Sequence, residues 1–395
     1  MNVITLESLL HDSKHIIDQD IQDRKARGED FNIFSVLGME TNETRTHSKM
    51  LVALLNPKEN HYFEDTFLKL FLDKIGYDYE DEDLKRATVQ AEYHLGRIDK
   101  AYDTGGFIDI LVLFSSGKTI AIENKIYAGD QRKQMYRYSL HNKGQTTLYY
   151  LNLYGEPPSP QSIDGLELED FRVISYTDEI LKWLDKCLNL KEMNSSSIIY
   201  NSIKQYQILL KRLTHTMEDT LEKELKDAIL NNLEAAKFVN FHYQKVVDEV
   251  REKFRKAVYE KFTTLHLGLD VHLGLDSSNQ NSQIWIDTLE FRKRDIRFGI
   301  ESFSGKGNND GRLFVGIFNK QKICDNILSG DRRLNIYWPV IREIKTTKNN
   351  YLNLSSSKIL EDLNKEADYF IEMVDTVVEQ VVVFLNDYEA EYLRS

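Results

Sequence analysis

Cysteine is scarce in this chain of 395 residues, which has only Cys187 and Cys324. Two cysteines cannot supply the disulfide framework of a small secreted domain. No apolar run comes near the roughly 18 residues of a membrane-spanning helix, and the N-terminal residues lack the basic start and the apolar core of a signal peptide. The sequence therefore predicts a cytoplasmic protein with reduced thiols and no membrane partner.

Basic residues are also in short supply. The chain has 51 Lys and Arg against 63 Asp and Glu, for a formal net charge of −12. Non-specific affinity for nucleic acid depends on Lys and Arg side chains that displace counterions from phosphates. Such a chain would therefore bind nucleic acid only through a confined basic cleft. Residues 125–145 fit this description, because five basic residues stand there against a single acid, Asp130.

Proline is rare as well, with five in the chain, while 41% of the residues are hydrophobic and can build sizeable cores. The length suggests two or three domains. Apolar periodicity and caps predict helices over 4–27, 44–56 and 63–75, the last closed by Gly76. Strands over 87–95, 107–114 and 119–125 follow, and then a helix from 129 to about 142. The region ends with strands over 146–153 and 171–176 and with helices from 177 and over 198–213.

The elements predicted from residue 216 onward follow a different order. A helical pattern runs from Thr216 to about Phe262, three alternating segments over 283–291, 294–303 and 312–319 indicate an antiparallel meander, and a helix covers about 357–388. We therefore expect a first domain over 1–214 and a C-terminal α+β domain over 215–395. The second domain has no catalytic constellation, so it would select substrate or mediate oligomerisation. Its Trp285 and Trp338 could stack on bases, but core packing or a partner interface is the favoured interpretation.

Three charged residues stand inside the predicted strands 107–114 and 119–125, where an unpaired charge is costly. Glu123 and Lys125 are two residues apart, so the strand pleat directs both side chains to one face, roughly 6.6 Å apart. If residues 115–117 form a three-residue loop with a left-handed glycine, Asp109 faces Glu123. A two-residue loop would instead place Asp109 opposite Asn124.

The first register gathers two carboxylates and one ammonium at one point of a sheet. A buried structural ion pair is the simpler alternative, since Lys125 could neutralise one of the acids. That alternative leaves the second carboxylate unexplained.

These residues resemble a known signature. Asp109, a gap and then Glu123-Asn124-Lys125 are similar to the D…(D/E)-X-K pattern of the PD-(D/E)XK nuclease superfamily, with Ile108 in place of the proline. The segments 43–57 and 125–131 resemble the opening helix and the region after the catalytic strand in a bacterial branch of that superfamily. The resemblance covers about residues 31–190 and implies a restriction-endonuclease-like αβββαβ core, that is, a mixed central sheet flanked by helices.

The resemblance also implies a metal site. Carboxylates from two strands suit a hard divalent cation such as Mg²⁺, for which Mn²⁺ could substitute. The expected ligands are Asp109, Glu123, Asn124 and Glu43, and Lys125 would hold the attacking water or meet charge that develops on the phosphate. For Glu43, which lies at the start of the helix over 44–56, favourable interaction with the helix dipole is the alternative explanation.

The helix predicted from residue 129 would present Gln131, Gln134 and Tyr138 on one face. The resemblance supports a role for Gln134 in catalysis and for Tyr138 near the phosphate. The expected nucleic-acid contacts are Lys125, Arg132, Lys133, Arg137 and Tyr138. An ordinary polar helix surface is the alternative, above all for Gln131.

The sequence thus predicts a divalent-metal-dependent nuclease that hydrolyses phosphodiester bonds, with DNA as the favoured substrate. Family resemblance suggests bacterial restriction or antiviral defence against phage. A homo-oligomer is expected if both strands of a duplex are cut. Two alternatives remain open: a noncatalytic nucleic-acid or protein binding module on a nuclease fold, and an RNA-directed nuclease of the same chemistry.

Overall fold

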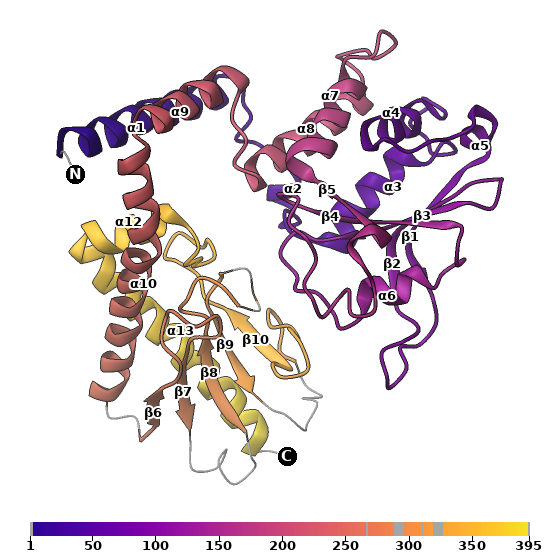
Figure 1. Ribbon diagram of the computed structural model, residues 1–395. Coiled ribbons are helices and arrows are strands. Elements are labelled where there is room, and N and C mark those ends of the chain that lie inside the picture. The colour runs from indigo at the N-terminus through magenta and orange to yellow at the C-terminus, as the bar shows by residue number, and fades with distance from the viewer. Residues whose placement is uncertain are drawn as a thin grey trace. The chain divides into compact units, whose positions relative to one another are not determined.

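The computed structural model of the protein describes residues 3–265, 268–287, 296–307, 309, 311–318 and 327–393. These residues form two compact units, the first ending at Asn232 and the second beginning at Leu233 (Figure 1). Cys187 is buried and free. Cys324 and parts of three predicted strands, residues 288–291, 294–295 and 319, lie outside the described residues.

The first unit contains a five-stranded mixed sheet in the order β1-β2-β3-β4-β5. Its strands are β1 (Thr88–His94), β2 (Phe107–Leu113), β3 (Thr119–Asn124), β4 (Thr146–Asn152) and β5 (Phe171–Ser175). β1, β2 and β3 pair antiparallel, whereas β3, β4 and β5 pair parallel. With α6 (Gln134–Ser139) between β3 and β4, this is the αβββαβ order of a restriction-endonuclease-like core, as predicted.

The helices of the first unit, besides α6, are α1 (Val3–Ala26), α2 (Ile33–Val36), the π-helical turn η1 (Glu43–Ser48), α3 (Lys49–Leu55), α4 (Thr66–Ile75), α5 (Asp81–Arg86), η2 (Leu168–Asp170), η3 (Tyr176–Ile180), α7 (Leu181–Leu188), α8 (Ile198–Leu213) and α9 (Asp219–Asn231). Gly76 ends α4 in the left-handed conformation, as its sequence position predicts.

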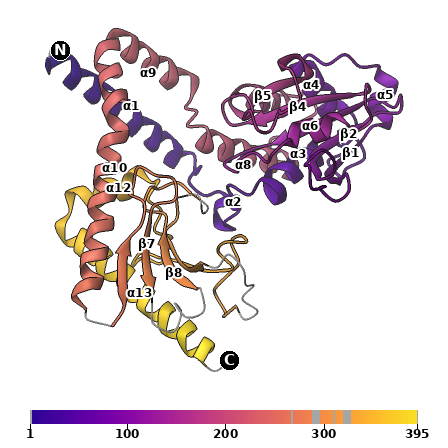
Figure 2. The same cartoon turned by 60° about the horizontal axis from the view of Figure 1, so that its bottom comes forward.

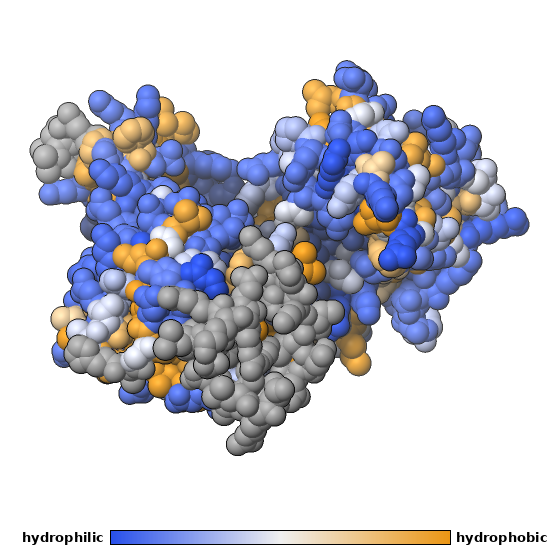
Figure 3. Space-filling model, turned by 90° about the horizontal axis from the view of Figure 1, so that it is seen from below, coloured by the Kyte–Doolittle hydropathy of each residue, from blue (hydrophilic) through white to orange (hydrophobic). Residues whose placement is uncertain are grey.

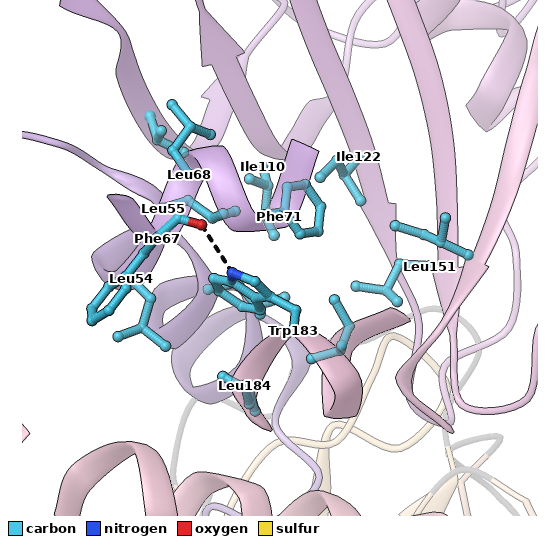
Figure 4. Close-up of a cluster of buried hydrophobic side chains, with 14 of the residues drawn as sticks. Leu54, Leu55, Phe67, Leu68, Phe71, Ile110, Ile122, Leu151, Trp183 and Leu184 are labelled. Carbon is cyan, nitrogen blue, oxygen red and sulfur yellow. Dashed lines mark hydrogen bonds between the residues drawn. The ribbon is translucent and has the colours of Figure 1, made fainter. Parts of the chain in front are cut away.

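The larger core of this unit lies between the sheet and α3, α4, α7 and α8. The apolar stripe of α3, with Leu51, Leu54 and Leu55, is buried there because these residues recur on one helical face. Trp183 fills the centre of the cluster in Figure 4, and its indole nitrogen donates a 2.9 Å hydrogen bond to the carbonyl oxygen of Phe67. A smaller cluster packs α6 against the opposite face of the sheet.

The helices predicted from residue 129 and over 216–262 differ in the structure from their predicted bounds. The predicted helix from residue 129 starts only at Gln134, because Lys133 has a left-handed backbone with a φ of 53°. The predicted helix over 216–262 is divided at Asn232 into α9 and α10 (Leu233–Thr264). α9 packs against α1, so the boundary between the units follows α9 rather than preceding it at residue 214 (Figure 2).

The second unit is α+β. Its antiparallel sheet has the order β10-β9-β8-β7-β6, with β6 (Asp270–Leu273), β7 (Gln283–Asp287), β8 (Arg297–Glu301), β9 (Phe314–Phe318) and β10 (Val340–Glu343). The predicted meander β7–β9 is confirmed, and β6 and β10 extend it beyond the three predicted segments. The predicted C-terminal helix is divided at Glu366, whose backbone is extended, into α12 (Ser357–Lys365) and α13 (Ala367–Leu393).

α10 and α13 cover one face of this second sheet with a large apolar core. On the other face Trp338 is buried and stacks on Trp285, with ring centroids 5.9 Å apart. The two rings lie over the paired glycines Gly299 and Gly316, where a Cβ atom would come within about 3 Å of a tryptophan ring. Core packing, the favoured interpretation, therefore accounts for Trp338.

The described helices include none with both the length and the apolar content needed to cross a membrane. On the face drawn in Figure 3, apolar residues are scattered in small groups among hydrophilic ones.

Candidate active site

The turn between β2 and β3 sets the register of the site. Gly117 has a φ of 87°, and the N–H of Phe114 donates to the carbonyl oxygen of Lys118 at 3.0 Å, which closes a three-residue loop. Ile110 then pairs with Ile122. Asp109 therefore faces Glu123, as the parity argument predicts.

Glu123 and Lys125 lie together on the face of the sheet that carries α6. Glu123 is 1% exposed, and neither of its carboxylate oxygens receives a hydrogen bond of good geometry. Lys125 Nζ lies 2.5 Å from Glu123 Oε1 and is itself buried. Burial raises the pKa of Glu123 despite this ion pair. Burial also opposes the charge of Lys125, but Glu123 and Asp109 outweigh it and raise the lysine pKa.

Asp109 is partly buried beside Glu123. Its Oδ2 accepts a 2.7 Å hydrogen bond from the backbone N–H of Asn124. Burial and then the negative charge of Glu123 raise the pKa of Asp109 well above its ordinary value. Two carboxylates that disfavour each other's charge in this way gain from a cation placed between them.

Asn124 does not direct its side chain into the site. Its Nδ2 donates to Ser48 Oγ at 3.0 Å, and its Oδ1 accepts from Tyr176 OH at 2.8 Å, on the opposite face of the sheet. The side chain of Asn124 is therefore turned away from the cavity, and the ligand role predicted for this residue could be met only by its backbone. The N–H and C=O of one strand residue point to the same side, so its carbonyl oxygen is directed toward β2 and Asp109.

Glu43 comes to the site from the π-helical turn η1. Its Oε1 accepts three backbone hydrogen bonds, from Ile126 at 2.6 Å, Tyr127 at 3.0 Å and Ala128 at 2.9 Å. The three donors belong to the segment directly after Lys125. Glu43 thus holds this segment, an arrangement that neither a ligand role nor helix-dipole electrostatics predicts.

Gln134 and Tyr138 form a buried pair on α6. Gln134 Oε1 accepts from the backbone N–H of Gln131 at 3.1 Å, and its Nε2 donates to Tyr138 OH at 3.1 Å. The Tyr138 hydroxyl donates to the carbonyl oxygen of Phe107. Tyr138 lines the cavity but is 2% exposed and its hydroxyl is engaged, and its contact with nucleic acid stays a prediction.

The predicted basic contacts differ in their surroundings. Arg137 is buried and donates to the carbonyl oxygens of Gly105 and Arg132, so it holds the loops around it. Its contact with nucleic acid stays a prediction. Lys133 Nζ pairs with Asp103 Oδ1 at 2.6 Å. Arg132 is exposed, with its guanidinium 5.7 Å from the ring centre of Tyr102.

These residues surround a cavity of about 260 Å³. Its wall includes Glu43, Asp109, Glu123, Lys125 and Gln134, together with one acid absent from the sequence prediction, Glu92 of β1. Burial raises the pKa of Glu92. The predicted strand over 87–95 already contained the signal, because Glu92 is a charge in a strand interior, as Asp109 is.

The donor set suits a hard divalent cation. Glu123 offers two buried oxygens, one of them beside the Lys125 ammonium, and Asp109 and Glu92 add further carboxylates, which are the ligands that Mg²⁺ prefers. Within the described part of the chain, no group of three or more acidic, histidine or cysteine side chains is already arranged to hold a metal ion. The arrangement is an open set of acids with one neighbouring ammonium.

Comparison with known proteins identifies one family. Residues 31–211 match the family model described as PD-(D/E)XK nuclease superfamily. No curated protein and no solved structure matches the chain. The matched residues include the whole sheet of the first unit and every element around the cavity, and they support a nuclease-type function in general.

Proposed function

Because residues 31–211 belong to the PD-(D/E)XK nuclease superfamily, we propose that this protein is a divalent-metal-dependent nuclease that hydrolyses phosphodiester bonds, with DNA as its favoured substrate. The superfamily typically uses divalent metals, and Mg²⁺ is the proposed ion, with Mn²⁺ as a substitute.

One observation carries the proposal. Asp109 and Glu123 face each other across β2 and β3, and the Lys125 ammonium lies on the same face, 2.5 Å from Glu123. Glu123 is buried, and no backbone N–H donates to its oxygens among the hydrogen bonds of the described residues. A structural ion pair would need one acid and one base, so the second carboxylate favours a site for an additional cation.

The proposed roles follow from these positions. Asp109, Glu123 and the carbonyl oxygen of Asn124 would hold the cation. When bound there, it would lower the pKa of a water and neutralise charge on the phosphate. Lys125 orients the attacking water or stabilises the charge that develops on the phosphate oxygens. Glu43 fixes the backbone that follows Lys125, because it accepts hydrogen bonds from residues 126–128.

Gln134 has a supporting role in this proposal. Its side chain links Gln131 to Tyr138, so it stabilises the wall of the cavity. Arg132 and Lys133 are the proposed contacts to the phosphate backbone, and Lys133 would exchange Asp103 for a phosphate.

The test is cleavage of supercoiled plasmid and of RNA in Mg²⁺ or Mn²⁺. Wild-type protein is compared with Asp109→Ala and Lys125→Ala, and chelation with EDTA serves as a further control. We expect wild-type cleavage of DNA and loss of at least about 100-fold in both variants, as for residues that stabilise transition-state charge. Activity that survives both substitutions overturns the assigned site. Cleavage of RNA alone supports the RNA-directed alternative.

The second unit is proposed to select substrate or to mediate oligomerisation, and a dimer would allow both strands of a duplex to be cut. A role in restriction or defence against phage rests on the family resemblance alone. Light scattering tests oligomerisation. Plaque counts on bacteria that express wild-type or Asp109→Ala protein test defence.

A further inference from the structure

Glu92 occupies the middle of β1, at the level of the site. It falls between the pairs Ala91–Ile110 and Tyr93–Ile108, which places it opposite Asp109. Asp109 in turn faces Glu123 across β2 and β3. Three carboxylates from three adjoining strands therefore stand on one rung of the sheet, at the wall of the same cavity.

The backbone of Glu92 has an unusual conformation. Its φ is 53°, in the left-handed region that residues with a Cβ atom rarely adopt and that is out of place inside a strand. Strained backbone of this kind collects at ligand sites, where the surrounding structure holds it in place. Glycine would adopt the same φ without strain. The presence of glutamate here therefore needs a reason that lies in its side chain.

The alternation of side chains breaks at the same rung. Val89 packs in the large core, yet Tyr93, four residues later, packs against the cluster on the α6 face. In β2, Ile110 and Ile108 are divided between the same two clusters. Residues separated by an even number would share a face in a regular strand. Both strands thus change face where Glu92 and Asp109 meet.

Thr44 hydrogen-bonds to the Glu92 side chain, but the surroundings satisfy this carboxylate only in part. Its Oε1 is buried and has no hydrogen-bond partner. Four acidic residues line the cavity, and Lys125 is the one basic residue in its lining. That ammonium lies against Glu123, two strands away from Glu92. The negative charge on this rung exceeds what the lining can neutralise.

From this placement we infer that Glu92 is a third carboxylate ligand of the divalent cation, together with Asp109 and Glu123. The inference rests on the proposed function and extends its metal site from two strands to three. Glu92 binds the cation from the side of β1, across the rung from the Lys125–Glu123 pair. Its left-handed backbone keeps the carboxylate at the cavity wall where the strands change face.

The experiment measures Mn²⁺ binding by isothermal titration calorimetry on the full chain, so its readout does not depend on cleavage. The variants are Glu92→Gln, which keeps the size and removes the charge, and Asp109→Asn. Glu64→Gln is the matched control, because Glu64 also has a positive φ, 47°, but is exposed and outside the cavity. We expect Glu92→Gln to weaken Mn²⁺ binding by about 10-fold or more, and Glu64→Gln to bind as wild type does.

A second pair of variants separates a ligand from a structural residue. Glycine relieves strain at a positive φ, so Glu92→Gly should raise the melting temperature without metal and reduce the rise that Mn²⁺ produces. Glu64→Gly should also raise the melting temperature without metal, but it should leave the rise that Mn²⁺ produces unaltered. If Glu92→Gly instead lowers the melting temperature and keeps the full response to Mn²⁺, the side chain serves packing and the inference is wrong.

The outcomes also distinguish this inference from the proposed function. Loss of binding in Asp109→Asn with wild-type binding in Glu92→Gln rejects only the role of Glu92. Wild-type binding in both variants, or no binding of Mn²⁺ to the wild type, rejects the metal site itself.

Discussion

Glu43 Oε1 lies 2.6 Å from the backbone nitrogen of Ile126, the residue that follows Lys125. Two more backbone donors, from Tyr127 and Ala128, reach the same oxygen. A side chain from η1 thus fixes the path of the chain directly after β3. The position of the Lys125 ammonium depends on this contact, because its backbone is held between β3 and the Glu43 carboxylate.

We therefore predict that Glu43→Gln lowers cleavage activity by about 10-fold or more, since a neutral amide oxygen accepts these hydrogen bonds more weakly than a carboxylate does. Hydrogen exchange should become faster in a peptide that covers residues 126–128. Glu59→Gln, a change of an exposed glutamate upstream of the sheet, is the control. Unaltered exchange at 126–128 would show that Glu43 does not hold this segment.

The ion pair between Lys125 and Glu123 gives a prediction for stability. Lys125→Met leaves a buried carboxylate without its partner, so in EDTA we expect a loss of about 3 kcal/mol in the free energy of unfolding of the first unit. Adding Glu123→Gln removes the unpaired charge and should recover most of this loss. A double-mutant cycle in urea measures the coupling. Additive effects of the two changes would contradict a coupled pair.

Two arginines near the cavity should respond differently. Arg137→Gln removes hydrogen bonds to buried carbonyl oxygens and should destabilise the first unit by about 1–3 kcal/mol. Arg132→Gln should leave stability unchanged and weaken DNA binding, with a slope against log salt that is smaller by about one. Thermal unfolding and binding titrations at several salt concentrations test this pair. Equal effects of both variants on stability would contradict the assigned surroundings.

The stability of the first unit should fall in acid because of His47. This residue is buried, its Nε2 lies 2.8 Å from the carbonyl oxygen of Glu40, and burial lowers its pKa from 6.5 to about 4. The unfolded chain therefore binds more protons than the folded chain between these two pH values. Stability from this group is complete above about pH 6.5 and declines as the pH falls toward 4, by about 3 kcal/mol.

The measurement compares wild type with His47→Gln, whose amide can replace the hydrogen bonds of the ring to the Glu40 carbonyl oxygen and the Tyr206 hydroxyl. Hydrogen exchange of peptides from β3, followed at several pH values, reports the first unit alone. The variant should lose less stability in acid than the wild type does, and His11→Gln, at an exposed position, should behave as wild type. Parallel pH profiles of wild type and His47→Gln would reject this account.

The centre of the site could be predicted from the sequence because strand geometry is simple. A pleat with a period of two and a three-residue turn place Asp109, Glu123 and Lys125 on one face without knowledge of the rest of the fold. The register and the left-handed Gly117 confirm that step. The same argument could have included Glu92, because it lacked only the pairing of the strand over 87–95 with the strand that carries Asp109.

The surrounding residues could not be predicted in this way. Arg137 is buried because loops distant in sequence bring carbonyl oxygens to it, and no local pattern encodes that. Asn124 faces away from the site because Ser48 and Tyr176 engage its amide. The start of α6 depends on the left-handed backbone of Lys133, which the polar sequence around it does not reveal.

The packing of α1 against α9 has a consequence for any attempt to isolate the nuclease portion. Both helices lie outside residues 31–211, yet each shields the other from water. A shortened protein that begins at Phe31 and runs through Asn232 would present an uncovered helix and invite aggregation. The two helices should be kept or deleted as a pair.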